Sequence, residues 1–272
     1  MDILKDINES IDQIWCLNCG MTSFTKSGFT KDKRQRIKCK YCNTKTTIGA
    51  KRKGERLFDE NKLLPILRKN PLSLSKAEKY CMGLIIADGC FTQGHTFSYS
   101  CAEKDKEIIL NIKQILGIGN PIGEYSRKSN KNKKELMLRW RYKYSKEYWA
   151  QLGLNANKTG NEVWLGYMED SHFIRGYFEG DGCIFSNGKE VRLSFTSLSK
   201  DFLTKLSNYL HSVLGIKKQE PYFIHEKRIN ALGLRYRRKE TLLICDYLYE
   251  DSKGLRLERK YQKYLEIKKA LY

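Results

Sequence analysis

Two aspartates stand at equivalent places in a motif that this 272-residue chain carries twice. Asp88 lies in YCMGLIIADGC and Asp181 in FIRGYFEGDGC, 93 positions apart, each after an apolar run and before glycine and cysteine. The 51 Lys and Arg outnumber the 31 Asp and Glu, and the net charge of +20 favours a polyanionic partner. Carboxylate oxygens are suited to Mg²⁺. One such aspartate would indicate a turn cap, but two equivalent ones predict metal-dependent cleavage of a nucleic acid.

The apolar runs are predicted to be helices that place these acids. The sequence SKAE at residues 75–78 has the spacing of a capping box, so a helix is expected to begin there. Asp170 or Ser171 can cap the second helix. Gly89 is expected to end the first helix in a left-handed conformation, and Gly182 to end the second.

Small residues four apart predict that the two helices pack closely. Gly83 and Ala87 in the first helix, and Gly176 and Gly180 in the second, each lie on one helix face. Close packing would bring Asp88 and Asp181 together at the negative ends of two helix dipoles, where their charges repel. A divalent cation would reverse that repulsion.

After each helix the pattern alternates with period two, as in half-buried strands. The apolar positions predict one buried face, and the polar positions predict a basic and hydroxyl-bearing face that can read DNA in the major groove. An ordinary solvated sheet face is the alternative. The predicted DNA-binding residues are Thr96, Ser98, Ser100, Arg139, Arg141, Arg192, Ser194, Thr196, Arg235 and Arg237.

The first fifty residues contain two Cys-x-x-Cys pairs. Cys16 and Cys19, with Cys39 and Cys42, supply four thiolates for a closed structural zinc site. The segment resembles the zinc ribbons at the N-termini of some transposases, a resemblance that implies DNA binding, with protein docking as the alternative.

Composition bounds the remaining possibilities. No run reaches the roughly 18 apolar residues that a membrane span needs, and no export signal is visible. We therefore expect a cytoplasmic protein of bacterial or phage origin, or an organellar one, with reduced thiols. Five further cysteines are interpreted as small core residues: Cys81, Cys90, Cys101, Cys183 and Cys245.

The expected domain organisation follows the repeat. It consists of a zinc ribbon at residues 1–50, a basic linker at 51–74, a first unit at 75–165 and a second at 166–272. Each unit is predicted to contain a helix, two strands, a helix, two strands and a helix.

The two motifs, their spacing and this order of elements resemble a single-chain LAGLIDADG homing endonuclease over about residues 75 to 268. The resemblance implies an α/β (α+β) fold of two pseudo-symmetric αββαββα units that form a saddle over DNA. It further implies a monomer that makes a double-strand break in a long, nearly palindromic target. A non-cleaving DNA- or RNA-binding protein of the same fold, such as a transcription regulator or an intron maturase, is the alternative, although such proteins lose one or both acids.

The resemblance also assigns the metal ligands. It implies that Asp88 and Asp181 are the catalytic acids and that the carbonyls of Ala87 and Gly180 complete the Mg²⁺ (or Mn²⁺) sites. The sixth letter of the family motif, an aspartate, is replaced by Ile86 in one copy and by Glu179 in the other.

A basic residue near each metal is a further implication of the resemblance. Lys143 is the candidate in the first unit, and Arg237 or Arg238 in the second.

Overall fold

The computed structural model describes residues 24–40, 43–47, 66, 69–91, 96–127, 130–141, 146–154, 160–188, 190–224 and 231–271. The chain divides into two compact units. The small unit contains the described residues up to Thr47 together with 141 and 146–147, and the large unit those of 66–140 and 148–271.

The small unit is an antiparallel sheet in the order β1-β2-β3. Its strands are β1 (Phe24–Phe29), β2 (Gln35–Cys39) and β3 (Lys45–Thr47). The side chains of Ile37 and Cys39 are buried. The chain turns after Cys39, where Asn43 takes a positive φ of 60° and its amide donates to the Cys39 carbonyl at 3.1 Å.

The large unit repeats one order of elements, as the sequence predicts. The first copy consists of α2 (Lys76–Asp88), β4 (Cys90–Phe91), β5 (Thr96–Ala102), α3 (Lys106–Ile115), β6 (Ile122–Arg127), β7 (Asn130–Arg141) and α4 (Lys146–Gln151). The second consists of α5 (Ser171–Asp181), β8 (Gly182–Ser186), β9 (Val191–Ser197), α6 (Lys200–Leu214), β10 (Tyr222–Phe223), β11 (Leu232–Arg237) and α7 (Arg238–Tyr249). An additional helix, α8 (Glu258–Leu271), follows the second copy.

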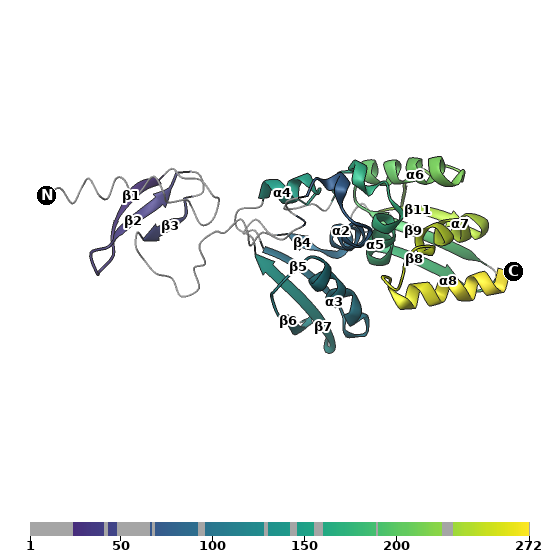
Figure 1. Cartoon of the computed structure of the whole chain (residues 1–272), viewed down its shortest axis with the longest axis horizontal. Coiled ribbons are helices and arrows are strands. Elements are labelled where there is room, and N and C mark those ends of the chain that lie inside the picture. Colours follow the sequence, from purple (N-terminus) through teal and green to yellow (C-terminus); the bar gives the residue numbers. More distant parts are fainter. Residues whose placement is uncertain are drawn as a thin grey trace. The chain divides into compact units, whose positions relative to one another are not determined.

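Two four-stranded sheets flank a central pair of helices. The strand orders are β4-β5-β7-β6 and β10-β11-β9-β8, and α2 and α5 lie side by side between the sheets (Figure 1). Helices α6 and α7 pack on one face of the second sheet. Among the described helices, none combines the length and apolar character that crossing a membrane requires.

The predicted alternation of buried and exposed strand positions is confirmed. In β9, Leu193 and Phe195 are fully buried, while Ser194 between them is half-buried. The ladder of β9 with β11 pairs Arg235 with Ser194 and Arg237 with Arg192, so these polar side chains share the face opposite the helices.

The helix starts are confirmed, and the conformation predicted for Gly89 is wrong. Ser75 and Glu78 form the capping box of α2, and Asp170 caps α5 by accepting from the His172 amide at 2.8 Å. Gly89 ends α2 with φ −71° and ψ 147°, which is extended backbone that any residue adopts. Space explains the glycine instead, because an added Cβ would lie 2.4 Å from the Ile85 carbonyl oxygen.

Glycines let α2 and α5 approach backbone to backbone. A Cβ atom on Gly83 would lie 2.1 Å from the carbonyl oxygen of Phe173, and one on Gly176 would lie 2.1 Å from that of Tyr80. Both contacts are with backbone, which cannot rotate away as a side chain can. The tight helix pair expected from the sequence is therefore present.

We predict that Gly83→Ala lowers the free energy of unfolding by about 3 kcal/mol or more, at the upper end of overpacking costs. The higher helix propensity of alanine would by itself stabilise α2 by about 1 kcal/mol. A loss of stability would therefore come from the collision of the added methyl group with α5. Chemical denaturation measures the effect. Gly119→Ala is the matched control, since an added Cβ there meets nothing within 4 Å; equal effects of the two variants would contradict the packing argument.

Candidate functional site

The helix pair brings the ends that carry the two motif aspartates into contact. Asp88 is the last residue of α2 and Asp181 the last of α5. A Cβ atom on Gly180 would lie 2.4 Å from the Cβ of Ala87 and 3.2 Å from Oδ2 of Asp88. The Asp88 carboxylate thus lies beside the end of the other helix, and it is exposed, whereas Asp181 is half-buried.

Both carboxylates act on the same buried tyrosine. The pKa of Tyr177 is raised well above its ordinary value, chiefly by burial and further by the negative charges of Asp181 and Asp88. The Tyr177 hydroxyl donates to the carbonyl of Thr196 at 2.8 Å, which ties α5 to β9. On the other side of the pair, burial and the Asp88 charge raise the pKa of Tyr99 in β5.

A buried lysine from α8 reaches the end of α5. The Lys260 ammonium donates to the carbonyls of Phe178 at 2.7 Å, Glu179 at 2.9 Å and Gly182 at 2.6 Å. An ammonium has three N–H donors, so these bonds use all of them. Burial lowers the pKa of Lys260 to about 8, while the carboxylates of Glu179 and Asp88 act in the opposite direction. The sequence pattern gives no signal for this residue, because the repeat offset of 93 places Tyr167, not a lysine, at the corresponding position.

The two positions that depart from the expected motif are buried. Ile86 and Glu179 are each 3% exposed. Tyr80 on α2 donates to the Glu179 carboxylate at 2.6 Å, and burial raises the pKa of that acid. Glu179 therefore joins the two helices internally.

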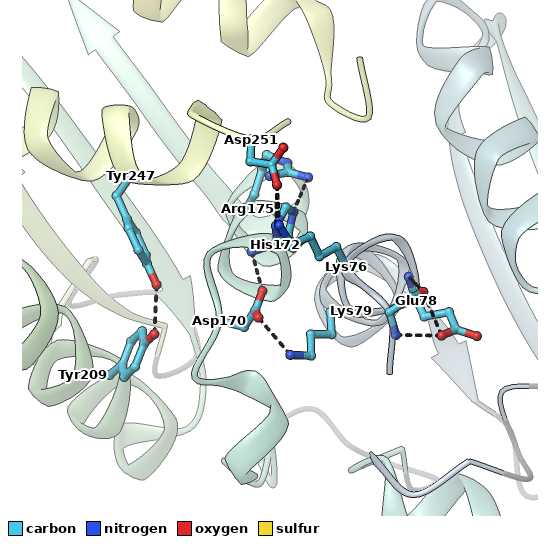
Figure 2. A network of polar contacts seen from close by, with 10 residues as sticks. Lys76, Glu78, Lys79, Asp170, His172, Arg175, Tyr209, Tyr247 and Asp251 are labelled. Carbon is cyan, nitrogen blue, oxygen red and sulfur yellow. Dashed lines mark hydrogen bonds and ion pairs between the residues drawn. The ribbon is translucent and has the colours of Figure 1, made fainter. Parts of the chain in front are cut away.

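Polar contacts clamp the opposite ends of α2 and α5. Figure 2 shows Lys79 of α2 reaching Asp170, the cap of α5, and His172 in contact with both Arg175 and Asp251. The Lys79 ammonium lies 2.8 Å from the Asp170 carboxylate. Lys76 pairs with Asp251 at 2.5 Å. Since starts meet starts and ends meet ends, the helices run in the same direction and their two C-terminal carboxylates share one side of the molecule.

Arg175 secures the second copy around this clamp. Its buried guanidinium donates to the carbonyls of Leu248 at 2.9 Å and Leu255 at 3.1 Å, and it lies 5.0 Å from the ring centre of Tyr80. The chain between α7 and α8 is thereby fixed to α5, which helps to position Lys260.

The donor set at the helix ends fits a hard divalent cation. It offers two aspartate carboxylates at C-terminal helix ends, where backbone carbonyls gather. Among the described residues, no group of three or more His, Cys, Asp or Glu side chains could hold a metal. A metal here would therefore need backbone oxygens, such as those of Ala87 and Gly180, and water beside the two carboxylates.

The structure places most of the predicted DNA-binding residues on the two open sheet faces. Half-buried positions include Thr96, Ser98 and Ser100 on β5, Arg192, Ser194 and Thr196 on β9, and Arg235 on β11. Arg139 on β7 and Arg237 on β11 are exposed, and Arg141 ends β7. Their contact with DNA stays a prediction.

Of the three basic residues predicted to act beside the metals, the structure describes Arg237 and Arg238. Lys143 lies outside the described residues. Arg237 precedes α7 and lines a cavity with Arg235, and Arg238 begins α7 with φ 33°. Lys260 is the basic side chain whose described bonds reach the end of a motif helix.

Of the four predicted zinc ligands, the structure describes one. Cys39 is buried at the end of β2, where its amide donates to the Thr44 carbonyl at 2.9 Å. Cys16, Cys19 and Cys42 lie outside the described residues. The zinc site stays a prediction.

The assignment of all five remaining cysteines to the core is wrong for two of them. Cys81 and Cys245 are buried and Cys101 is half-buried, but Cys90 and Cys183 are exposed. Each exposed thiol lies in a strand directly after a motif glycine, where Cys90 pairs with Ser98 and Cys183 with Ser194, and so faces the open side of its sheet.

Comparison with known protein families finds a match within the second copy. Residues 168–237 match the LAGLIDADG-like domain family, from the turn before α5 to the end of β11. Among curated proteins, none matches this chain.

Solved structures show a similar fold. The homing endonuclease I-WcaI bound to its DNA recognition sequence has a TM-score of 0.50 and 16% identity, over 73% of this chain and 87% of that one. The I-LtrWI LAGLIDADG homing endonuclease bound to target DNA gives a TM-score of 0.49 and 12% identity, over 71% and 90%. Full-length DUF199/WhiA from Thermatoga maritima gives 0.45 and 14%, over 78% and 66%. The large unit thus has a mixed α/β fold similar to that of LAGLIDADG endonucleases.

We predict that Lys260→Met lowers the free energy of unfolding by about 2 kcal/mol or more, because it leaves buried carbonyls at the end of α5 without a charged donor. Urea denaturation measures the change. Lys263→Met on the same helix is the control; its surface pair with Glu266 at 3.0 Å should contribute less than about 1 kcal/mol. Equal losses of unfolding free energy in both variants would contradict the structural role assigned to Lys260.

Proposed function

We propose that this protein is a site-specific endonuclease that hydrolyses both strands of DNA with a divalent metal. The observation that carries the proposal is the abutment of the two helix ends that bear Asp88 and Asp181, in a chain of net charge +20. The matched domain family and the fold shared with a DNA-bound homing endonuclease support it.

Each part of the site has a physical role in this proposal. Asp88 and Asp181 supply the carboxylates, and the carbonyls of Ala87 and Gly180 supply further oxygens. The metal ions, when bound, would lower the pKa of an attacking water and stabilise the leaving oxygen. Lys260 holds the end of α5 in place, so that the Gly180 carbonyl and Asp181 keep their positions.

The open sheet faces would bind the DNA and position it at the two acids. Arginines, serines and threonines on adjacent strands present donors at the spacing of a sheet, and the excess of lysine and arginine would attract the phosphate backbone. Two such faces on either side of the acids suit a long target that is nearly palindromic, read by one chain.

We expect Asp88→Asn and Asp181→Asn each to abolish the double-strand break while DNA binding survives. The amide keeps the shape of the side chain but loses the charge that binds a cation. Cleavage of a randomised duplex library with Mg²⁺ or Mn²⁺, followed by sequencing of the cut ends, measures activity and target together.

The control is Asp201→Asn on α6, an exposed aspartate paired with Lys205 at 2.8 Å, which should cleave like the unaltered protein. If either motif variant made the double-strand break as fast as the unaltered protein, the catalytic role proposed for that aspartate would be wrong. Protection of DNA or RNA without any nick would instead favour the non-cleaving alternative, a transcription regulator or an intron maturase.

The proposal includes a zinc ribbon that extends the footprint on DNA. The purified full chain should contain about one zinc ion, held by four thiolates, and Cys39→Ser should lose it because a closed site tolerates no missing ligand. Metal analysis measures the content, with Cys101→Ser as the control that retains zinc. A full complement of zinc in Cys39→Ser would exclude this ligand set.

A further inference from the structure

A cavity of about 310 Å³ opens on the polar face of the second sheet, which carries Arg235 and Arg237. Its lining combines Gln219, Tyr222 of β10, Arg235 and Arg237 of β11, and Glu240 of α7. Cationic donors, a carboxylate and an aromatic ring thus converge where the proposed function places DNA.

Stacking fixes the guanidinium of Arg235. Tyr222 pairs with Gly233 in the ladder, and a Cβ atom on Gly233 would lie 3.3 Å from Cζ of the tyrosine, so the glycine leaves room for the ring. The Arg235 guanidinium lies 4.9 Å from the centre of that ring. A stacked guanidinium keeps its planar fork of donors in one orientation and loses less entropy when it binds a planar acceptor.

One N–H donor of this guanidinium lacks an acceptor among the described residues. Nε of Arg235 is buried without a hydrogen-bond partner in the described structure. A buried donor without a partner costs free energy, so it marks a place where a ligand acceptor is favourable. The cavity beside it is where such an acceptor would enter.

Glu240 makes the cavity selective. It lies in the first turn of α7, where an acidic side chain is favourable to the helix dipole. That negative charge opposes a phosphate in the cavity but accepts from an amino group. The cavity therefore offers a fork of donors and an acceptor together, a combination that matches a base pair better than the DNA backbone.

We propose that this cavity reads a G·C pair through the major groove, with Arg235 donating to guanine and Glu240 accepting from the amino group of cytosine. Guanine presents two acceptors, O6 and N7, that fit a guanidinium fork, and cytosine presents an N4 donor. The inference rests on the DNA-binding part of the proposed function and is independent of cleavage.

The experiment is binding selection by the full chain from a randomised duplex library without added Mg²⁺ or Mn²⁺, followed by sequencing of the bound fraction. In the sequences bound by the unaltered protein, one target position should be a G·C pair. Arg235→Ala should lose about 5- to 150-fold of discrimination there and leave the other positions unchanged. Glu240→Ala should weaken the same position, and thermal unfolding verifies that each variant is folded.

Arg235→Lys separates base reading from a phosphate contact. It keeps the charge but loses the fork, so the salt dependence should persist while discrimination is lost. Lys205→Ala on α6 is the control that should leave every preference unchanged. Uniformly weaker binding to all sequences by Arg235→Ala, or a preferred pair other than G·C at the affected position, overturns the inference. Failure of the unaltered protein to bind any duplex would refute the proposed function itself.

Discussion

The close approach of α2 and α5 at Gly83 and Gly176 is the contact on which the rest of the large unit depends. A side chain at either glycine would collide with a carbonyl of the other helix, so the spacing of the helices is set by backbone atoms. Farther along the pair, the same spacing brings Ala87 and Asp88 against Gly180. The geometry of the carboxylates is therefore a consequence of packing about one and a half turns away, and a change at Gly83 would disturb carboxylates that it does not touch.

This packing creates an electrostatic cost that the surrounding residues offset. Two carboxylates at the negative ends of parallel helices are unfavourable to each other and to the dipoles. Lys260 places a cation on the final carbonyls of α5, and its pKa of about 8 leaves it mainly protonated at neutral pH. Its three donors are already used by carbonyls, so it stabilises the helix end rather than replacing a metal. The remaining negative charge at Asp88 and Asp181 is what a divalent cation would neutralise.

Local and periodic features made much of this fold predictable from sequence. The capping box at Ser75 and Glu78, the small residues of the two helices and the period-two strands each depend on neighbours within a few positions. The prediction for Gly89 is wrong because the usual preference of glycine at a helix end is for the left-handed conformation. Here the position needs glycine for another reason, since a Cβ atom would collide with Ile85. The exposure of Cys90 and Cys183 could not be predicted from residue type, because cysteine is buried on average. Lys260 could not be found at all, because its partners are backbone carbonyls 78 to 82 positions away.

The repeat also conceals an asymmetry that only the packed structure reveals. Tyr167, which the repeat offset pairs with Lys260, is buried, and its hydroxyl donates to the Leu152 carbonyl at 2.7 Å. Between α4 and α5 the structure describes a three-residue 3-10 helix, Gly166–Met168, which contains Tyr167, where the second copy has the long helix α8. Likewise Glu179 is a buried acid bonded to Tyr80, while Ile86 at the matching position is apolar. The two aspartates thus share a motif but not an environment: the same backbone contact places the ends of both helices together, and the charges around each one differ between the copies.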